Sequence, residues 1–214
     1  MMFANAISLR HPEGWFKRLA GLGLCLALLS ACATTRPSID LPEITTWELR
    51  QEVLGAISNW EFRGRIAVKA GDEGFNGKFR WTQTDDSFYA TVGGPLGIGT
   101  VVMEGNGRQV ILTDKDGLTT VLKNPEAELY YRYGWTIPVD SLRYWALGIP
   151  DPSSEAATEV GDAGRLLSLE QNNWAVKISR YRESAGQQMP RTLTATNPDT
   201  RVRMVIDNWL FFER

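Results

Sequence analysis

The chain has 214 residues, with 23 basic and 25 acidic side chains, one histidine and two cysteines. Without residues 1–31, which look like a removable signal, 20 basic and 24 acidic residues remain, a net charge of −4 that argues against nucleic acid as a partner. The histidine and one cysteine fall in that segment, which excludes Ser-His-Asp and Cys-His catalysis, His/Cys zinc sites and an intramolecular disulfide in the rest. We therefore expect no enzyme activity, no metal and no other cofactor.

The N-terminal segment has the pattern of a secretory signal. An apolar run, Leu19 to Ala31, follows three basic residues, and it is shorter than the roughly 20 apolar residues that span a bilayer. Its end, Leu29-Ser30-Ala31-Cys32, resembles the lipobox of bacterial lipoproteins. The alternative is an ordinary signal that is cleaved after a small residue, with Cys32 incidental.

The lipobox resemblance implies cleavage before Cys32 and acylation of both its sulfur and its new amine. Several acyl chains anchor a protein stably, because each buried methylene contributes about 0.8 kcal/mol. Ala33, rather than aspartate, follows the cysteine, and by resemblance this sends the protein to the outer membrane, anchored on its periplasmic face. We assign 1–31 to the signal, 32–43 to a lipidated N-terminus and tether, and 44–214 to one domain.

A helix is predicted at the start of this domain. Thr45 and Glu48 fit a capping box. Apolar residues then recur at helical spacing, namely Trp47, Val53, Leu54 and Ile57. The other side is assigned to Glu48, Arg50, Gln51 and Glu52 as a polar face.

From Trp60 onward the apolar period changes to two, which predicts strands separated by tight turns. The first group covers 60–69, 75–82, 88–92, 100–104, 110–113 and 118–123. Asn124-Pro125 starts a helix that ends at Gly134, and a second helix follows at 137–147. After an acidic loop at 151–162, strands return at 165–171, 174–181, 191–196 and 201–208.

These elements predict a mainly β fold with a few helices. A single antiparallel sheet of this length curls strongly, and we expect about three short helices to cover its concave face. The order of motifs resembles the LolB family of outer-membrane lipoprotein receptors. The matching strings are Trp60-x-Phe62-x-Gly64-Arg65, Gly77-x-Phe79-x-Trp81-x-Gln83, Gly94-Pro95-Leu96-Gly97, Ile137-Pro138-Val139-x-x-Leu142-x-x-Trp145-x-x-Gly148-x-Pro150, Trp174-x-Val176 and Asp207-Asn208-Trp209.

The resemblance implies an incomplete antiparallel β-barrel with a helical lid over a hydrophobic cavity. That cavity would hold the acyl chains of client lipoproteins, received from the periplasmic carrier LolA without nucleotide and released into the lipids of the outer membrane. We expect a monomer. The helix at 137–147 is our candidate for the lid. Family members often have asparagine where this chain has Gly94, a difference that we expect to matter little.

Apolar side chains that share one strand or helix face are the candidate cavity wall. They are Phe62, Ile66, Phe79, Trp81, Leu142, Trp145, Trp174, Met204 and Ile206. Ordinary core packing is the alternative for each of them, since a core and a cavity wall have the same composition.

Three further features have two interpretations each. Leu96, within Gly94-Pro95-Leu96-Gly97, is an exposed apolar finger for membrane release or a side chain folded back onto the core. The basic residues Arg63, Arg65, Lys69, Lys78 and Arg80 form a solvated face or a docking surface for a carrier. The acidic pairs Asp85-Asp86 and Asp114-x-Asp116 fit turns better than a catalytic or metal site.

The competing function is a structural or assembly-accessory lipoprotein that carries no lipid.

Overall fold

The computed structural model describes residues 37–93, 100–106 and 109–213. Contacts group Ser38–Arg214 into one unit, and the buried hydrophobic residues of the described chain, from Leu41 to Phe211, all lie within it. This unit therefore contains a hydrophobic core of its own. The signal, Cys32 and the loop Gly94, Pro95, Leu96, Gly97 lie outside the described residues.

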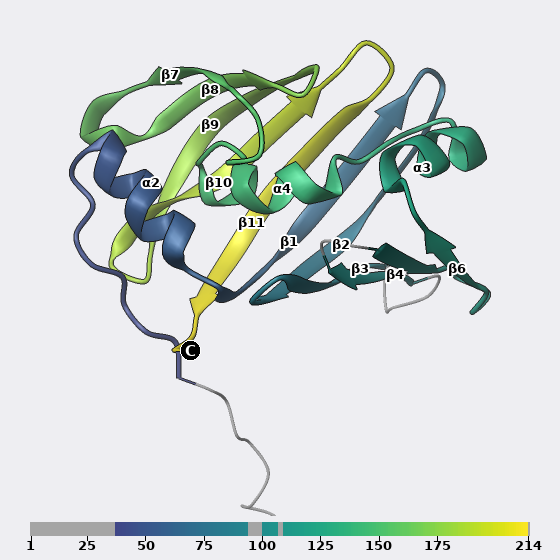
Figure 1. Ribbon diagram of the computed structural model, residues 1–214, viewed down its shortest axis with the longest axis horizontal. Coiled ribbons are helices and arrows are strands. Elements are labelled where there is room, and N and C mark those ends of the chain that lie inside the picture. Colours follow the sequence, from purple (N-terminus) through teal and green to yellow (C-terminus); the bar gives the residue numbers. More distant parts are fainter. Residues whose placement is uncertain (1–36, 94–99, 107–108, 214) are drawn as a thin grey trace, which may run out of the picture. The chain divides into compact units, whose positions relative to one another are not determined.

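One antiparallel sheet of eleven strands makes up most of the described unit (Figure 1). Its strands are β1 Asn59–Ala70, β2 Glu73–Thr84, β3 Ser87–Gly93, β4 Val101–Asn106, β5 Gln109–Thr113, β6 Thr119–Leu122, β7 Ala157–Val160, β8 Leu166–Gln171, β9 Trp174–Ser184, β10 Gln187–Thr196 and β11 Arg201–Phe211. The spatial order is β6-β5-β4-β3-β2-β1-β11-β10-β9-β8-β7. Pairing of β1 with β11 joins the two halves of the chain, and β6 and β7 form the outer edges of this unclosed sheet.

The period-two pattern places apolar side chains on the concave face and charged ones on the convex face. On β1, Phe62, Ile66 and Val68 are buried while Arg65 and Lys69 are exposed. The β1–β11 ladder shifts register between Arg63 and Gly64. A Cβ at Gly64 would lie 2.1 Å from the carbonyl oxygen of Val205, so this close approach of two strands requires glycine.

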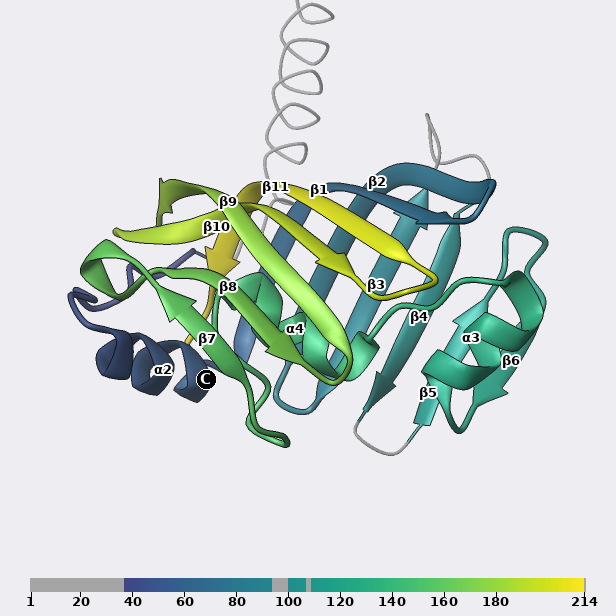
Figure 2. The same ribbon diagram turned by 90° about the horizontal axis from the view of Figure 1, so that it is seen from above.

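The helices lie along the concave side of the curved sheet (Figure 2). They are α2 Trp47–Ala56, α3 Pro125–Tyr133 and α4 Val139–Leu147, and a short 3-10 turn, η2, covers Asp162–Gly164. Of these, α4 lies inside the curve and buries six of its nine residues. The predicted fold class, a mainly β chain whose helices cover a concave sheet, is confirmed.

Helix boundaries agree with the sequence signals, with two corrections: α4 begins at Val139 rather than at residue 137, and α2 has a different cap. Asn124 caps α3, and Gly134 ends it in the left-handed conformation at φ +71°. Gly148 ends α4 in the same way, at φ +79°. The cap of α2 is Thr46 rather than Thr45: its hydroxyl accepts the hydrogen bond from the amide of Leu49.

Other corrections concern strand length. Residues 151–162 are not wholly a loop, because β7 occupies Ala157–Val160 at the edge of the sheet with all four residues exposed. The late strands are also longer than predicted: β9 reaches Ser184, β10 starts at Gln187 and β11 reaches Phe211. Among the residues that the structure describes, no helix is long and apolar enough to cross a membrane.

Candidate functional site

The concave face of the central strands carries a continuous aromatic cluster. Phe62 on β1 contacts Phe79 and Trp81 on β2, with ring centroids 5.3 and 6.5 Å apart. Trp81 stacks on Phe88 of β3 at 4.7 Å, and Trp60 stacks on Trp81 at 6.3 Å. These residues meet because positions two apart on a strand share a face, and because β1, β2 and β3 are direct neighbours.

The second half of the apolar interior lies between α4 and strands β9–β11. Trp145 on α4 contacts Trp174 on β9, with ring centroids 6.4 Å apart. Met204 on β11 lies opposite Ile66 on β1, and Ile206 lies opposite Gly64 in the register of the same pair. Trp145 and Trp174 therefore meet, whereas Trp81 belongs to the cluster on β1–β3.

All nine candidate wall residues point into the interior, with exposed fractions between 0 and 3%. They therefore fill the space between the sheet and α4 in this state. An acyl chain that entered the interior would have to displace some of these side chains or lift α4.

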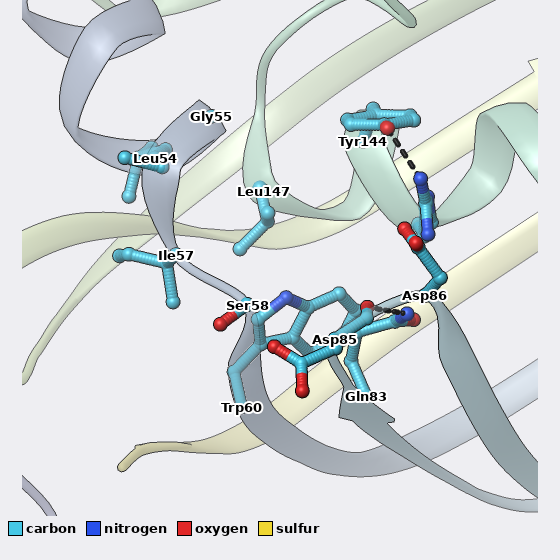
Figure 3. Close-up of a pocket in the computed structure, with 12 residues that line it drawn as sticks. Leu54, Gly55, Ile57, Ser58, Trp60, Gln83, Asp85, Asp86, Tyr144 and Leu147 are labelled. Carbon is cyan, nitrogen blue, oxygen red and sulfur yellow. Dashed lines mark hydrogen bonds between the residues drawn. The ribbon is translucent and has the colours of Figure 1, made fainter. Parts of the chain in front are cut away.

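A pocket of about 240 Å³ opens beside this interior, between the end of α2, α4 and the β2–β3 turn (Figure 3). Its apolar wall comes from Leu54, Ile57, Trp60 and Leu147. Polar groups flank it, including Asp85, Asp86, Arg143 and Tyr144. Ligand pockets commonly measure about 300–1,000 Å³, so this one has room for part of one acyl chain unless it expands.

A buried polar network fastens one side of α4. The indole N–H of Trp145 donates to Oε1 of Gln171 on β8 at 2.8 Å, and the amide of Asp151 donates to the same oxygen at 2.9 Å. The Gln171 amide nitrogen in turn donates to the carbonyls of Asp151 and Ser154, at 2.7 and 2.8 Å. Ser141 on α4 donates to the Asp151 carboxylate at 2.8 Å. Because buried amide and carboxyl groups are costly unless paired, this network holds α4 against the β8 side.

Arg50 fastens the C-terminal end of α4 and corrects the predicted polar face of α2. It is 1% exposed, although the sequence pattern assigned it to solvent. Its guanidinium donates to the carbonyls of Leu147 and Gly148 at 3.2 and 3.3 Å, and to that of Gln188 at 3.1 Å. The Tyr181 ring lies 5.4 Å from the guanidinium carbon. Burial lowers the pKa of Arg50, and burial also raises the pKa of Tyr181 to about 12.

The convex face carries the predicted basic residues. Glu61 accepts hydrogen bonds from Arg63 and Arg80, each at 2.6 Å. Burial raises the pKa of Glu61, but the hydrogen bonds from Arg80 and Arg63 outweigh this effect and leave the pKa below its usual range. Asp207 lies 3.4 Å from Arg65 and 3.9 Å from Arg191. The expected arrangement on neighbouring strands is confirmed for Arg63, Arg65, Lys69, Lys78 and Arg80.

Sequence reasoning left several interior residues out of the site. Trp60, Phe88, Trp209 and Phe211 are buried and join the aromatic cluster. The period of two that selected Phe62 also selects Trp60. Gln171, Asp151 and Arg50 gave no such signal, because the type of a polar residue does not reveal whether its side chain lies in a buried network or on the surface. The acidic pairs lie in turns, as expected, and within the described ranges no three metal-ligating side chains cluster.

Comparison with known proteins decides the family. Residues 58–209 match the family model described as "Outer membrane lipoprotein LolB". The chain is 36% identical over 194 residues to the outer-membrane lipoprotein LolB of Nitrosococcus oceani, which covers 90% of this chain and 96% of that protein. The chain belongs to the LolB family. A LolB of Stutzerimonas stutzeri is 31% identical over 192 residues, covering 88% of this chain and 93% of its own.

Two solved structures share the fold of this chain. A LolA superfamily protein from Nitrosomonas europaea superposes with a TM-score of 0.52 at 6% identity, over 79% of this chain and 94% of that one. A DUF1329 family protein from Desulfovibrio piger gives a TM-score of 0.51 at 9% identity, over 76% and 89% of the two chains. At such low identity the likeness establishes the fold alone. Family membership makes the chain an outer-membrane lipoprotein of the lipoprotein localisation pathway.

Proposed function

We propose that this protein accepts lipoproteins from a LolA-like periplasmic carrier by taking up their acyl chains, and inserts them into the outer membrane. The observation that carries the proposal is the apolar interior, in which aromatic and aliphatic side chains from β1, β2, β9, β11 and α4 converge. Lipid chains need such a lining, with few polar groups facing them. Transfer of acyl chains between proteins breaks no covalent bond, in keeping with a domain that has no histidine or thiol.

The filled interior is the arrangement that we expect of an acyl-chain receiver in its client-free state. An open apolar cavity of lipid size would expose its walls to water, at a cost of about 25 cal/mol per Å². Packing of Leu142, Trp145 and Trp174 removes that surface until acyl chains replace it. Forward transfer then needs only a higher affinity for acyl chains in the receiver than in the carrier, because a ligand moves toward the state that binds it better.

We assign the lid to α4 and the access route to the pocket beside it. Gln171 and Asp151 hold α4 on the β8 side, and Arg50 holds its C-terminal end. The side that faces Trp60 and the β2–β3 turn instead borders the open pocket (Figure 3). Acyl chains would enter there and separate α4 from the aromatic cluster on β1–β3.

The remaining parts of the proposal concern the membrane. Cys32 carries the lipid anchor, residues 32–43 connect it to the domain at 44–214, and Leu96 contacts the bilayer or the client during release. The protein acts as a monomer. These assignments rest on the sequence motifs and on family membership.

Quenching of tryptophan fluorescence tests the location of the acyl chains. A client lipoprotein with brominated acyl chains should quench the buried tryptophans of the domain, because bromine quenches indole only at close range. The control is the same client with unbrominated chains. A Trp47→Phe variant removes the half-buried tryptophan of α2 and should leave the quenching in place. Absence of quenching in a complex that has formed would contradict an interior site.

A structural or assembly-accessory role also predicts a filled interior, so the packing of this state is compatible with it. The two functions differ in their response to acyl chains. A structural protein would leave its tryptophans unquenched and would form no complex with the loaded carrier's client.

A further inference from the structure

A second surface of the molecule, the convex face of five neighbouring strands, has a charge that the proposed lipid receiver does not use. Strands β9, β10, β11, β1 and β2 are adjacent in the sheet (Figure 2). They carry four acidic residues: Glu61, Glu73, Glu183 and Asp207. Against these stand eleven basic residues: Arg63, Arg65, Lys69, Lys78, Arg80, Lys177, Arg180, Arg182, Arg191, Arg201 and Arg203. We call this surface the basic face.

The basic face contrasts with the rest of the chain: after residue 31 the whole chain has 20 basic and 24 acidic residues, so only 9 basic but 20 acidic residues lie outside these five strands. Register makes its cations neighbours: Arg65 lies opposite Lys78, while Lys177 and Arg203 both lie opposite Thr194. On the basic face, ion pairs join Arg63 and Arg80 to Glu61, and Arg65 and Arg191 to Asp207. Lys78, Lys177 and Arg203 are exposed, and their charge is uncompensated by these pairs.

Two grooves of about 470 Å³ each hollow this surface. Arg65 and Lys78 line both of them, joined by Arg203 in one and by Arg63, Arg80 and one acidic residue, Asp207, in the other. The floor is formed by small residues such as Ala67 and Gly77. Several cationic side chains around a shallow hollow match a phosphate group, which accepts hydrogen bonds from more than one donor.

We propose that the basic face docks on the anionic phospholipid headgroups of the membrane in which the protein is anchored. The anchor and the membrane location belong to the proposed function, and this inference rests on them. The tether supports it by its length. Ile39 is already fixed to the sheet, since its amide donates to the Phe211 carbonyl at 2.9 Å. The seven residues from Cys32 to Ile39 span at most about 25 Å, so the domain stays close to the headgroups.

The composition of the basic face favours lipid over a protein partner. Protein interfaces are enriched in aromatic residues, methionine and arginine, and of these the basic face exposes only arginine. The large apolar side chains that the structure exposes lie elsewhere: Tyr89, Leu118, Val121, Tyr130, Tyr131, Val160 and Leu167. A cationic surface without such anchors binds through summed electrostatic attraction, as polybasic segments bind anionic leaflets.

Vesicle sedimentation tests the proposal with the soluble chain 33–214, which contains the whole Ser38–Arg214 unit and lacks the lipid anchor. The probes are vesicles that contain phosphatidylglycerol and vesicles of pure phosphatidylcholine. The variant is Lys78→Gln/Lys177→Gln/Arg203→Gln, three exposed residues whose loss leaves no acidic partner unpaired. The control, Lys115→Gln/Lys123→Gln/Arg132→Gln, removes the same charge from exposed positions around β6 and α3, and it breaks one surface ion pair, that of Lys115 with Asp116.

We expect the parent chain to prefer vesicles with phosphatidylglycerol and to lose this preference in 1 M salt, where the Debye length falls to about 3 Å. Each basic residue near such a surface contributes about fivefold to partitioning, so the triple variant should bind about a hundredfold more weakly. The control should bind nearly as the parent does. Equal binding to both kinds of vesicle, or equal losses in variant and control, would overturn the proposal.

Acceptance of a client from the carrier in a vesicle-free solution separates this proposal from the proposed function. The triple variant should accept clients at the parental rate, because its substitutions lie outside the apolar interior. If it accepts them more slowly while its vesicle binding stays parental, the basic face docks a protein and the lipid proposal is wrong. If the parent itself accepts no client, the proposed function fails, whereas the vesicle measurement still decides the lipid proposal.

Discussion

Replacement of Arg50 by methionine should destabilise the protein through the end of α4. The guanidinium is 1% exposed and donates to three backbone carbonyls, two of which, Leu147 and Gly148, end that helix. A cation at this point also stabilises the helix, because it interacts favourably with the negative C-terminal end of the helix dipole. Methionine has a similar length, so it fills the space but leaves the carbonyls without their donor.

The expected loss follows from those carbonyls. Each buried acceptor that loses its partner costs about 1–3 kcal/mol. Removal of the buried charge offsets part of this loss of stability, because burial disfavours the charged form of the guanidinium. The net cost should be about 2–4 kcal/mol, or a fall in melting temperature of roughly 10 °C for a domain of this size. Gln51→Met, at the exposed next position of α2, should stay within about 0.5 kcal/mol of the parent.

Urea unfolding of the soluble chain measures the loss, and hydrogen exchange locates it. Amides of α4 should exchange faster in Arg50→Met than in the parent, while those of the β1–β2 pair should change little. A cost below about 1 kcal/mol, or faster exchange spread evenly over the sheet, would refute Arg50 as the fastening of α4.

Three further substitutions probe the sheet and its ionisable groups. Gly64→Ala places a Cβ 2.1 Å from the carbonyl oxygen of Val205 and should cost about 3 kcal/mol in urea unfolding, whereas Gly55→Ala in α2, with open space around it, should stabilise by up to about 1 kcal/mol. The folded-state pKa of the Glu61 carboxyl lies below its usual value, so the ionised carboxylate stabilises the fold at pH values above the usual pKa. This stabilisation is lost as the pH falls through the folded-state pKa. In Glu61→Gln the free energy of unfolding should therefore fall less steeply towards acid pH. The folded-state pKa of Tyr181 is raised from 10 to about 12, so its contribution is full below pH 10 and is lost as the pH rises to about 12. Tyr181→Phe should remove this alkaline loss, and an unchanged alkaline limb would contradict the buried position of the phenol.

The strands with alternating burial were predictable, and the exceptions have physical causes. On β1 and β2 one face is buried and the other charged, so a period of two marks both elements and their register. The strand β7 has four exposed residues and therefore lacks that signal. The candidate wall residues Trp145 and Trp174 could be named from their faces alone, although their faces could not establish that their rings meet.

Buried polar residues were the part of the site that the sequence concealed. Arg50 lies among acidic and amide residues of α2, and its role depends on three carbonyls from α4 and β10 that are distant along the chain. Gln171 is similar, since its four hydrogen bonds connect β8 to α4 and to the segment after it. Such positions are determined by tertiary contacts, so neither periodicity nor residue type predicts them.

Transfer of a client lipoprotein from a carrier to this domain tests the uptake of acyl chains. The soluble chain 33–214 is mixed with a purified carrier that holds a lipoprotein, without nucleotide or membrane, and the protein that co-purifies with the client is identified. The client should move to this domain. Retention of the client by the carrier, with the domain shown to be folded, would contradict an acyl-chain receiver and favour a structural role.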